Sequence, residues 1–325
     1  MTSAVAEENR ADGGSAPYPA VVRRKVDAVR HALARARRTT VEPFVGADGL
    51  PTMLAREELA LLYLLARDVV ETDAGVVELG TFLGGSTVAL GRGLQAAGSP
   101  ARIATFDRFR QPAWPAYDIT EGADVLGRWE QTVAPVRDRV DLHAGELEDC
   151  VPADGPTRSE LLFVDIVKHP STMQTVMASF VSGLEPGAIV VHQDLLHWGS
   201  PWVGVTIEAM WDRLVYVGQI ARSTGVFVVK EPLADVCQGI DWSAVSTPTS
   251  MVLLDALARR FTHPTLHGAI ALAGLWLART TDDGLFERRR AAVEPLLHGT
   301  RLQRWYTEVC ASSADGALRP GGHRR

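Results

Sequence analysis

Between residues 75 and 230, short runs of consecutive apolar residues alternate with longer segments in which apolar residues recur every three or four positions. The first pattern predicts buried β-strands and the second predicts amphipathic helices. The predicted strands are Val76–Leu79, Arg102–Phe106, Val140–His143, Leu161–Asp165, Ala188–His192, Leu214–Ile220 and Val226–Lys230. The clearest helix lies between the fourth and fifth strands, where the apolar positions are Met173, Val176, Met177, Phe180, Val181 and Leu184.

The spacing of the strands predicts their connections. Helices between the first five strands indicate parallel crossovers and a doubly wound α/β sheet. The last two strands are joined only by the short turn ARSTG. A parallel crossover needs about a dozen residues, so this pair is expected to form an antiparallel hairpin. A mostly parallel seven-stranded sheet with an antiparallel last strand is typical of class I methyltransferases, whereas dehydrogenase Rossmann domains normally lack that ending.

The segments outside this region have a different character. Residues 1–19 are rich in small and polar residues and are expected to be disordered, as is the tail from residue 312. Residues 21–38 predict an amphipathic helical arm, with Val22, Val26, Val29 and Leu33 on one face. We interpret it as an arm that packs on the core or on a second subunit; its basic clusters RRK and RARR leave nucleic-acid binding as the weaker alternative.

The loop at residues 45–51 separates this arm from a predicted helix at Arg56–Glu71. After residue 232 the pattern is helical throughout. We expect an appendage that covers the edge of the sheet, forms a lid over the site or mediates dimerisation. Its predicted helices are Met251–Phe261, Ala269–Leu277, Arg288–Leu297 and Leu302–Cys310.

Composition narrows the class of protein. The 325 residues include 46% hydrophobic and 22% charged residues, values that exclude global disorder. A net charge of -6 argues against binding driven by neutralisation of nucleic-acid phosphates. No apolar run reaches the roughly 18–20 residues of a membrane span, and the polar start lacks the features of a signal peptide. Three widely separated cysteines favour a reducing cytoplasm. We therefore expect a cytoplasmic protein without nucleic-acid or membrane partners.

The strongest local signal is VVELGTFLGGST at residues 76–87, which ends the first strand and opens a helix. Gly80 permits a sharp turn, Gly84 and Gly85 are expected to admit a ligand close to the backbone, and Ser86 is expected to cap the helix. The spacing G-x-x-x-G-G differs from the dinucleotide-binding G-x-G-x-x-G. An acid at position 78 would repel a pyrophosphate but suits the ammonium and sulfonium groups of S-adenosylmethionine. The residues expected to bind it are Glu78, Gly80, Thr81, Gly84 and Ser86.

Two further acids follow neighbouring strands. Asp107 ends the second strand in IATFD, where a carboxylate is placed to accept hydrogen bonds from both ribose hydroxyls. Taken alone, Asp107 could equally belong to a solvated turn. The third strand leads into Ala144-Gly145-Glu146, and Glu146 is the expected contact to the adenine edge.

Five segments of the chain carry a resemblance to a known family: ELGTFLGGS at 78–86, DRFRQP at 107–112, VDIVKHPSTM at 164–173, LEPGAIVVHQD at 184–194 and TGVFVVK at 224–230. In that order they resemble the E-x-G-x-x-x-G-G-S loop, the D-S-F-x-G-x-P stretch, the D-x-D-x-Y-x-S-T-M helix start, the L-x-P-G-G-x-x-x-x-D-D strand and the closing strand of the macrocin O-methyltransferase-like family. Members of that family act on sugars and other parts of natural products. The resemblance covers about residues 55–232 and leaves the arm and the appendage outside it.

This resemblance implies S-adenosylmethionine at the glycine loop and Asp107, and a substrate pocket over the ends of the fourth and fifth strands. Family members commonly hold magnesium there, through one acid after the fourth strand and an acidic pair after the fifth. Asp165, which is also counted among the cofactor-binding residues, and Asp194 match two of these positions, but Gln193 replaces one acid of the pair. Two carboxylates and an amide could still hold magnesium, so the expected ligands are Asp165, Gln193 and Asp194.

Methyl transfer to oxygen requires alignment of donor and acceptor and the removal of one proton. Asp165, Lys168 and His169 lie at the tip of the fourth strand and are the predicted catalytic residues. A lysine three residues after this Asp also serves as the base in catechol-type O-methyltransferases. The alternative is that Lys168 is a surface charge and that His169 packs in the loop. His192, within the fifth strand, is interpreted as a core histidine.

Aromatic residues crowd the expected rim of the pocket. His197, Trp198 and Trp202 follow the fifth strand in LLHWGSPW and are predicted to contact the substrate. Together with Trp114 and Tyr117 they could form the floor for an apolar or glycosidic acceptor. Each of them alone could equally be a packing residue.

Three hypotheses follow. The first is an S-adenosylmethionine-dependent O-methyltransferase acting on a small hydroxylated natural product. The second keeps the fold and ligand but replaces methylation with a cyclisation, another rearrangement or a scaffolding role. NAD-dependent oxidoreduction is disfavoured by the loop spacing and the hairpin. The expected organisation is a tip and arm at 1–50, a cofactor-binding domain at 51–232 and a helical appendage with tail at 233–325, with the terminal helices available for homo-oligomerisation.

Overall fold

The computed structural model of the protein describes residues 18–38, 49–152, 155–167 and 169–311. The predicted disordered tail and almost all of the predicted disordered tip lie outside these ranges. Most of the loop at 45–51 also lies outside them, and so does Lys168.

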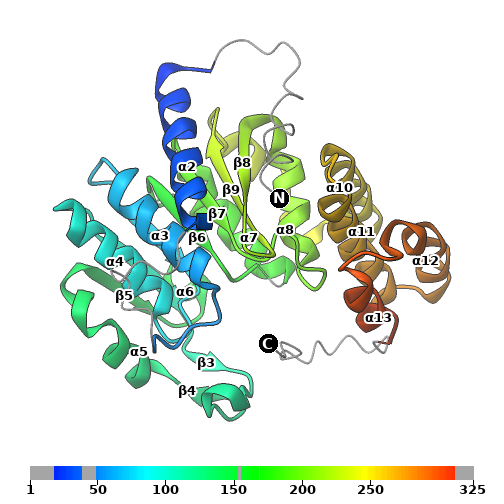
Figure 1. The fold of residues 1–325 in the computed structure, drawn as a ribbon, viewed down its shortest axis with the longest axis horizontal. Coiled ribbons are helices and arrows are strands. Elements are labelled where there is room, and N and C mark those ends of the chain that lie inside the picture. Colours follow the sequence, from blue (N-terminus) through cyan, green and yellow to red (C-terminus); the bar gives the residue numbers. More distant parts are fainter. Residues whose placement is uncertain (1–17, 39–48, 153–154, 168, 312–325) are drawn as a thin grey trace.

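A seven-stranded sheet forms the centre of the molecule (Figure 1). Its strands in spatial order are β5 (Val140–Ala144), β2 (Ile103–Asp107), β1 (Val76–Leu79), β6 (Leu161–Val164), β7 (Ile189–His192), β9 (Thr224–Val229) and β8 (Leu214–Ile220). The first five are parallel, and β9 runs antiparallel to both of its neighbours. The predicted mostly parallel sheet with an antiparallel last strand is confirmed, with strand ends shifted by at most two residues.

Helices cover both faces of this sheet. One face carries α2 (Ala20–Arg38), α3 (Arg56–Asp68), α4 (Gly85–Ala97) and α5 (Leu126–Val133), and the other carries α6 (Leu147–Cys150), α7 (Pro170–Ser179) and α8 (Pro201–Met210). Alternate residues of a strand point to opposite faces. In β6, Leu161 and Phe163 pack in the core on the α2–α5 face, while Leu162 and Val164 pack in the core on the α6–α8 face. This double burial is the reason why the strands appear as continuous apolar runs in the sequence.

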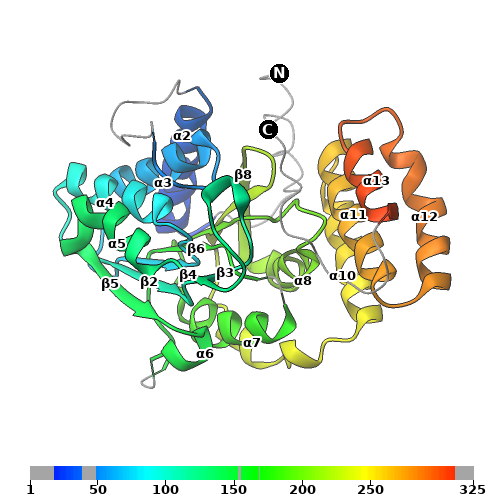
Figure 2. The same ribbon diagram turned by 90° about the horizontal axis from the view of Figure 1, so that it is seen from below.

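A small excursion interrupts the chain between β2 and α5. It contains the antiparallel pair β3 (Arg110–Gln111) and β4 (Ala123–Asp124), with a 3-10 turn, η3 (Pro115–Tyr117), between them. Figure 2, seen from below relative to Figure 1, shows this excursion in front of the central strands. The sequence patterns did not predict it, since two-residue strands are too short to show a period.

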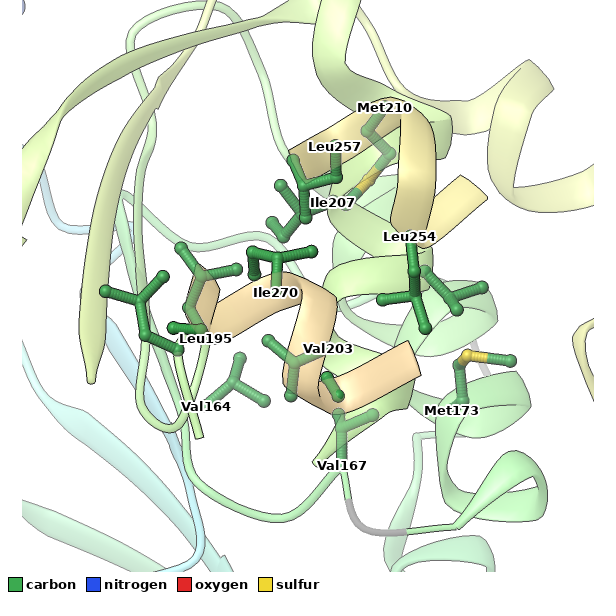
Figure 3. Close-up of a cluster of buried hydrophobic side chains, with 14 of the residues drawn as sticks. Val164, Val167, Met173, Leu195, Val203, Ile207, Met210, Leu254, Leu257 and Ile270 are labelled. Atoms are coloured by element: carbon green, nitrogen blue, oxygen red, sulfur yellow. The ribbon is translucent and has the colours of Figure 1, made fainter. Parts of the chain in front are cut away.

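The C-terminal appendage consists of α9 (Ala234–Gln238), α10 (Thr247–Arg260), α11 (Pro264–Arg279), α12 (Asp283–Leu297) and α13 (Gln303–Ala311). Its apolar side chains continue the core on the α8 face, where those of α8, α10 and α11 interdigitate (Figure 3). The close approach requires Gly204 of α8, because a Cβ there would lie 2.8 Å from Leu254 Cδ2. The appendage packs mainly on the helical layer at α8, while the edge strand β8 lies against α2. The appendage reaches that edge through Phe261, whose ring packs edge-on against Tyr216 of β8 with 5.3 Å between centroids.

None of the described helices combines the length and the apolar content needed to cross a membrane.

The N-terminal arm packs on the protein's own core through a buried lysine. Lys25 is 4% exposed, and its ammonium group donates to Glu160 and to the Val69 carbonyl oxygen and lies 3.2 Å from Glu71. The second carboxylate oxygen of Glu160 accepts hydrogen bonds from the Thr72 amide (2.7 Å) and hydroxyl (2.8 Å). Both oxygens of the Glu160 carboxylate thus have partners inside the protein, and the arm supplies the cation of this buried ion pair.

Replacing Lys25 by Met should therefore destabilise the protein strongly. The substitution keeps most of the side-chain volume but leaves a buried carboxylate without its cation, a change that typically costs about 3–5 kcal/mol. The matched control is Arg24→Met, which removes an exposed ion pair to Glu71 (3.3 Å) and should cost less than about 1 kcal/mol. Urea unfolding of the three proteins measures both effects. Equal losses in the two variants would contradict the structural role of Lys25.

Candidate active site

Four loops meet at one edge of the sheet because parallel strands present their carboxyl ends together. The backbone pairing continues one step beyond the strands and fixes where these loops begin. Gly80 donates to Phe106 (2.9 Å), Asp165 to Leu79 (2.8 Å) and Gln193 to Val164 (3.0 Å). The glycine loop, Asp107, Asp165 and the segment after β7 therefore share this edge.

The glycine loop depends on left-handed backbone conformations. Gly80 and Gly84 have φ of 86° and 91°, and Phe82 between them adopts φ of 53°. Gly80 is also closely packed, since a Cβ there would lie 2.6 Å from Ile166 Cγ2. The predicted sharp turn at Gly80 is confirmed.

One expectation about this loop is wrong. Gly84 is the N-cap of α4, so Ser86 lies inside the first turn and does not cap the helix. Gly84 and Gly85 also serve packing, because added Cβ atoms would lie 2.7 Å from Val133 Cγ1 and 2.6 Å from Thr52 Cβ, respectively. On those sides the two glycines admit α5 and the segment before α3.

A chain of hydrogen bonds holds the loop from beneath. The Trp129 indole donates to the Thr81 hydroxyl (2.9 Å), which lies 2.6 Å from the Thr87 hydroxyl, and Thr87 donates to Glu78 (2.6 Å). Since the indole only donates and Thr87 donates onward, Thr81 must donate to Thr87, so all three bonds run toward the carboxylate. Thr105 of β2 donates to the same carboxylate oxygen at 2.8 Å. The side chain of Thr81, predicted to bind the cofactor, is 3% exposed and fully engaged in this chain.

Glu78 itself has no exposed surface, and its Oε1 atom has no hydrogen-bond partner. Burial raises the pKa of Glu78 to about 7; the hydroxyl groups of Ser86, Thr87 and Thr105 oppose this shift, and the negative charge of Asp107 adds to it. The carboxyl group of Glu78 thus lies beneath the glycine loop and helps to hold it in place.

Asp107 ties the glycine loop to the tip of β2. Its Oδ2 atom accepts hydrogen bonds from the backbone amides of Thr81 (2.9 Å) and Phe82 (3.0 Å), and Oδ1 accepts from Phe109 (2.7 Å). A carboxylate has about four acceptor positions, so one remains for a ligand hydroxyl. Glu146, the other predicted contact on this side, is exposed and directly precedes α6.

The excursion between β2 and α5 covers the same loop. The Tyr117 ring packs edge-on against Phe82 at 5.0 Å between centroids, and its hydroxyl donates to the Thr52 carbonyl oxygen (2.6 Å). Tyr117 therefore connects the glycine loop to the segment before α3. In the same excursion, the buried indole nitrogen of Trp114 has no hydrogen-bond partner.

The predicted acceptor-side residues lie across the edge, after β6 and β7. Asp165 is half-buried and His169 is exposed, immediately before α7; Lys168 lies outside the described residues. Asp194 adopts a left-handed φ of 63°, and the buried Oε1 atom of Gln193 has no hydrogen-bond partner. These residues share one side of the site, opposite Glu146.

The predicted metal ligands do not form a metal-binding cluster. In the part of the chain that the structure describes, no three Asp, Glu, His or Cys side chains are gathered in an arrangement that could hold an ion. The amide oxygen of Gln193 is neutral, so the predicted set contains only two carboxylates, Asp165 and Asp194. The described side chains therefore do not support the predicted magnesium site.

Of the predicted substrate-contacting residues, His197 and Trp198 lie in the loop after β7 and Trp202 lies in the first turn of α8. His197 and Trp202 are half-buried, and Trp198 is 9% exposed. His197 Nδ1 accepts a hydrogen bond from the Gly199 amide (3.2 Å), which orients the ring. His192 is 4% exposed and lines a small, mostly apolar cavity between the sheet, α7 and α8.

One residue at this edge was missed by the sequence patterns. Glu58 of α3 is 6% exposed; its carboxylate accepts hydrogen bonds from the Thr224 hydroxyl and from the Ala55 amide (2.7 Å). Burial raises its pKa to about 7, and the negative charge of Asp194 contributes to this rise. In the sequence Glu58 looked like an ordinary acid of a helix's first turn, and only its burial could have distinguished it.

Comparisons with known proteins agree with this geometry. Residues 77–195 match a family model described as a methyltransferase domain. A search of curated proteins found no match. Among solved structures, the chain is similar to the O-methyltransferase NovP, with 14% identity over 65% of this chain and 98% of that one and a TM-score of 0.43. It is similar to the calicheamicin methyltransferase CalS11 (17% identity, 63% and 91% coverage, TM-score 0.41). A third is the SAH-bound methyltransferase PaMTH1 of Podospora anserina (17% identity, 71% and 97% coverage, TM-score 0.39).

The buried acid predicts how the stability of the protein changes with pH. The pKa of Glu78 is about 7 in the folded protein and near the ordinary value of 4.5 in the unfolded chain, so the folded state binds the proton more tightly. Its stabilising contribution is complete below pH 4.5 and is lost as the pH rises toward 7, by at most about 1.4 kcal/mol per unit. Glu78→Gln should flatten this decline, as measured by urea unfolding at pH 5 and pH 8.

Glu185→Gln, at an exposed position, is the matched control and should keep the slope of the unsubstituted protein. An unchanged slope in Glu78→Gln would show that Glu78 does not bind the proton in this range.

Proposed function

We propose that this chain, a class I methyltransferase with its methyltransferase domain at residues 77–195, transfers the methyl group of S-adenosylmethionine to a hydroxyl group of a small natural product. The observation that carries the proposal is the glycine loop clamped between two acids, Glu78 and Asp107, at the tips of adjacent strands. Such a site combines negative charge with a tightly held backbone turn, and a cationic nucleoside ligand requires both.

The donor side of the site follows from this clamp. S-adenosylmethionine supplies an electrophilic methyl group on a positively charged sulfur. Asp107 has one acceptor position left for a ribose hydroxyl, and Glu78 places negative charge beneath the loop. The free amides in the first turn of α4 suit the amino-acid carboxylate of the donor. Gly80, Gly84 and Ser86 would contribute through the backbone, while Glu146 and Asp165 would bound the adenosine.

The acceptor would lie over the ends of β6 and β7. The reaction there is an in-line displacement, so the protein must orient the hydroxyl toward the methyl group and accept its proton. Asp165 and Asp194 provide carboxylates at the correct strand ends, and His169 provides an imidazole that would accept the proton of the hydroxyl group. Lys168 keeps its proposed role as an alternative base. No step is assigned to magnesium, because Gln193 interrupts the acidic set.

The choice of oxygen as the methylated atom rests on the resemblance of residues 55–232 to the macrocin O-methyltransferase-like family. The competing proposal, a conversion without methyl transfer, shares the donor site and differs only in the product. It predicts donor binding without formation of S-adenosylhomocysteine, whereas methyl transfer predicts both.

Asp107→Asn should weaken binding of S-adenosylmethionine by about 10- to 100-fold. The amide keeps one oxygen acceptor but loses the charge, and hydrogen bonds to charged groups contribute about 1.5–3 kcal/mol. Titration calorimetry measures the change, with the exposed Asp149→Asn as the control. Undiminished binding in Asp107→Asn would remove the residue from the donor site.

Incubation with methyl-labelled donor and a panel of hydroxylated acceptors tests the reaction itself. We expect S-adenosylhomocysteine and a labelled product to form, and we expect the rate to be unchanged by EDTA because the described residues gather no cluster of acidic, His or Cys side chains that could hold an ion. Loss of activity in EDTA, with recovery on added magnesium, would overturn the metal-free proposal. Donor binding without product from any acceptor would favour the competing conversion.

A further inference from the structure

The last helix of the appendage reaches the candidate acceptor site. The Trp305 ring of α13 packs edge-on against His197, with 5.7 Å between centroids and an interplanar angle of 66°. His197 in turn stacks on Trp198 at 5.5 Å and 22°. The rings of His197, Trp198 and the distant Trp305 thus form a continuous row, which we call the aromatic wall.

The position of the wall is fixed by the backbone of the loop after β7. The His197 amide donates to the Asp194 carbonyl oxygen (3.0 Å), and the Leu196 amide donates to Ser223 (3.1 Å) in the turn before β9. The rings therefore begin within one turn of Asp194, at the strand end where the proposed function places the acceptor. In Figure 1, α13 and the β3–β4 excursion both lie in the lower part of the view.

The wall is held from behind by the appendage. Trp198 packs edge-on against Trp276 of α11 at 5.2 Å and 75°, and Trp276 is 5% exposed. The buried indole nitrogen of Trp198 has no hydrogen-bond partner. An indole N–H loses free energy when it is buried unpaired, so this nitrogen is a candidate donor to a ligand oxygen after a small side-chain movement.

The side chains of α13 make two kinds of contact. Tyr306 and Val309 are buried toward the rest of the appendage, at 7% and 0% exposure. Trp305 is half-buried; it packs against the same core and also contacts His197. The attachment of the appendage to α8 is provided mainly by α10 and α11 (Figure 3), and the ring of Trp305 extends the contacts of α13 to the loop after β7.

We propose that Trp305 is a specificity-determining residue of the acceptor site, and that the aromatic wall binds the flat apolar face of a ring in the acceptor. This inference rests on the proposed function. A pyranose with C–H groups on one face and an aromatic ring share the required chemistry, since both stack on indole and imidazole rings. The indole nitrogen of Trp198 adds a single donor for an oxygen on the edge of that ring.

The test uses the full chain saturated with S-adenosylhomocysteine. Saturation-transfer difference NMR against methyl glycosides and against simple phenols reports which ring class binds and through which face. We expect one class to bind the unsubstituted protein, and we expect Trp305→Leu, which keeps an apolar side chain, to weaken that binding about tenfold or more. The matched control on the same helix is Arg304→Ala, whose guanidinium pairs with Glu308 at 3.0 Å, and it should bind normally.

Calorimetry with S-adenosylmethionine separates the failure of this inference from the failure of the proposed function. Normal donor affinity in Trp305→Leu, together with a raised KM and an unchanged kcat for any acceptor that is turned over, supports the wall. Equal ring binding in Trp305→Leu and the unsubstituted protein would overturn it. So would the absence of ring binding from both classes of probe. Failure of the unsubstituted protein to bind S-adenosylmethionine would instead refute the proposed function.

Discussion

The site depends on keeping one carboxylate, that of Glu78, inside the protein. A buried acid is tolerated only when hydroxyl or amide donors surround it, and here the donors come from α4, β2 and, through Thr81, from Trp129 of α5. The hydrogen bonds to its Oε2 atom therefore hold these three elements against β1. The glycine loop passes over that junction, so the same bonds fix the position of the turn that would hold the donor.

The same loop is enclosed by protein on several sides. Asp107 binds its amides, Tyr117 packs on Phe82, and Thr52 and Val133 take the space beside Gly85 and Gly84. These contacts mean that the glycines serve packing as much as ligand access. A substitution at either position would displace neighbouring elements as well as alter the loop.

The edge of the sheet divides into two halves that are built from different parts of the chain. The proposed donor half uses β1, β2, α4 and the excursion after β2, which lie in the region of the methyltransferase-domain match. The proposed acceptor half uses the loop after β7 and receives rings from α11 and α13, which lie beyond that match. With these roles, the acceptor side could change with the appendage without disturbing the hydrogen-bonded chain under the donor side.

The succession of strands and helices along the chain, the parallel direction of the first five strands, the closing hairpin and the position of the glycine loop were determined by the sequence alone, because they follow from local periodicity and from the lengths of connections. The spatial order of the strands was not predicted. The capping of α4 was not, since a left-handed Gly84 and a Ser86 look equally suitable as caps until the path of the chain is known. What approaches Gly85, which acid is buried beside Asp194, and which ring meets His197 were decided only by the tertiary structure. Each of these depends on side chains far apart in sequence, and a pattern of residue types carries no information about which distant segment will lie against which.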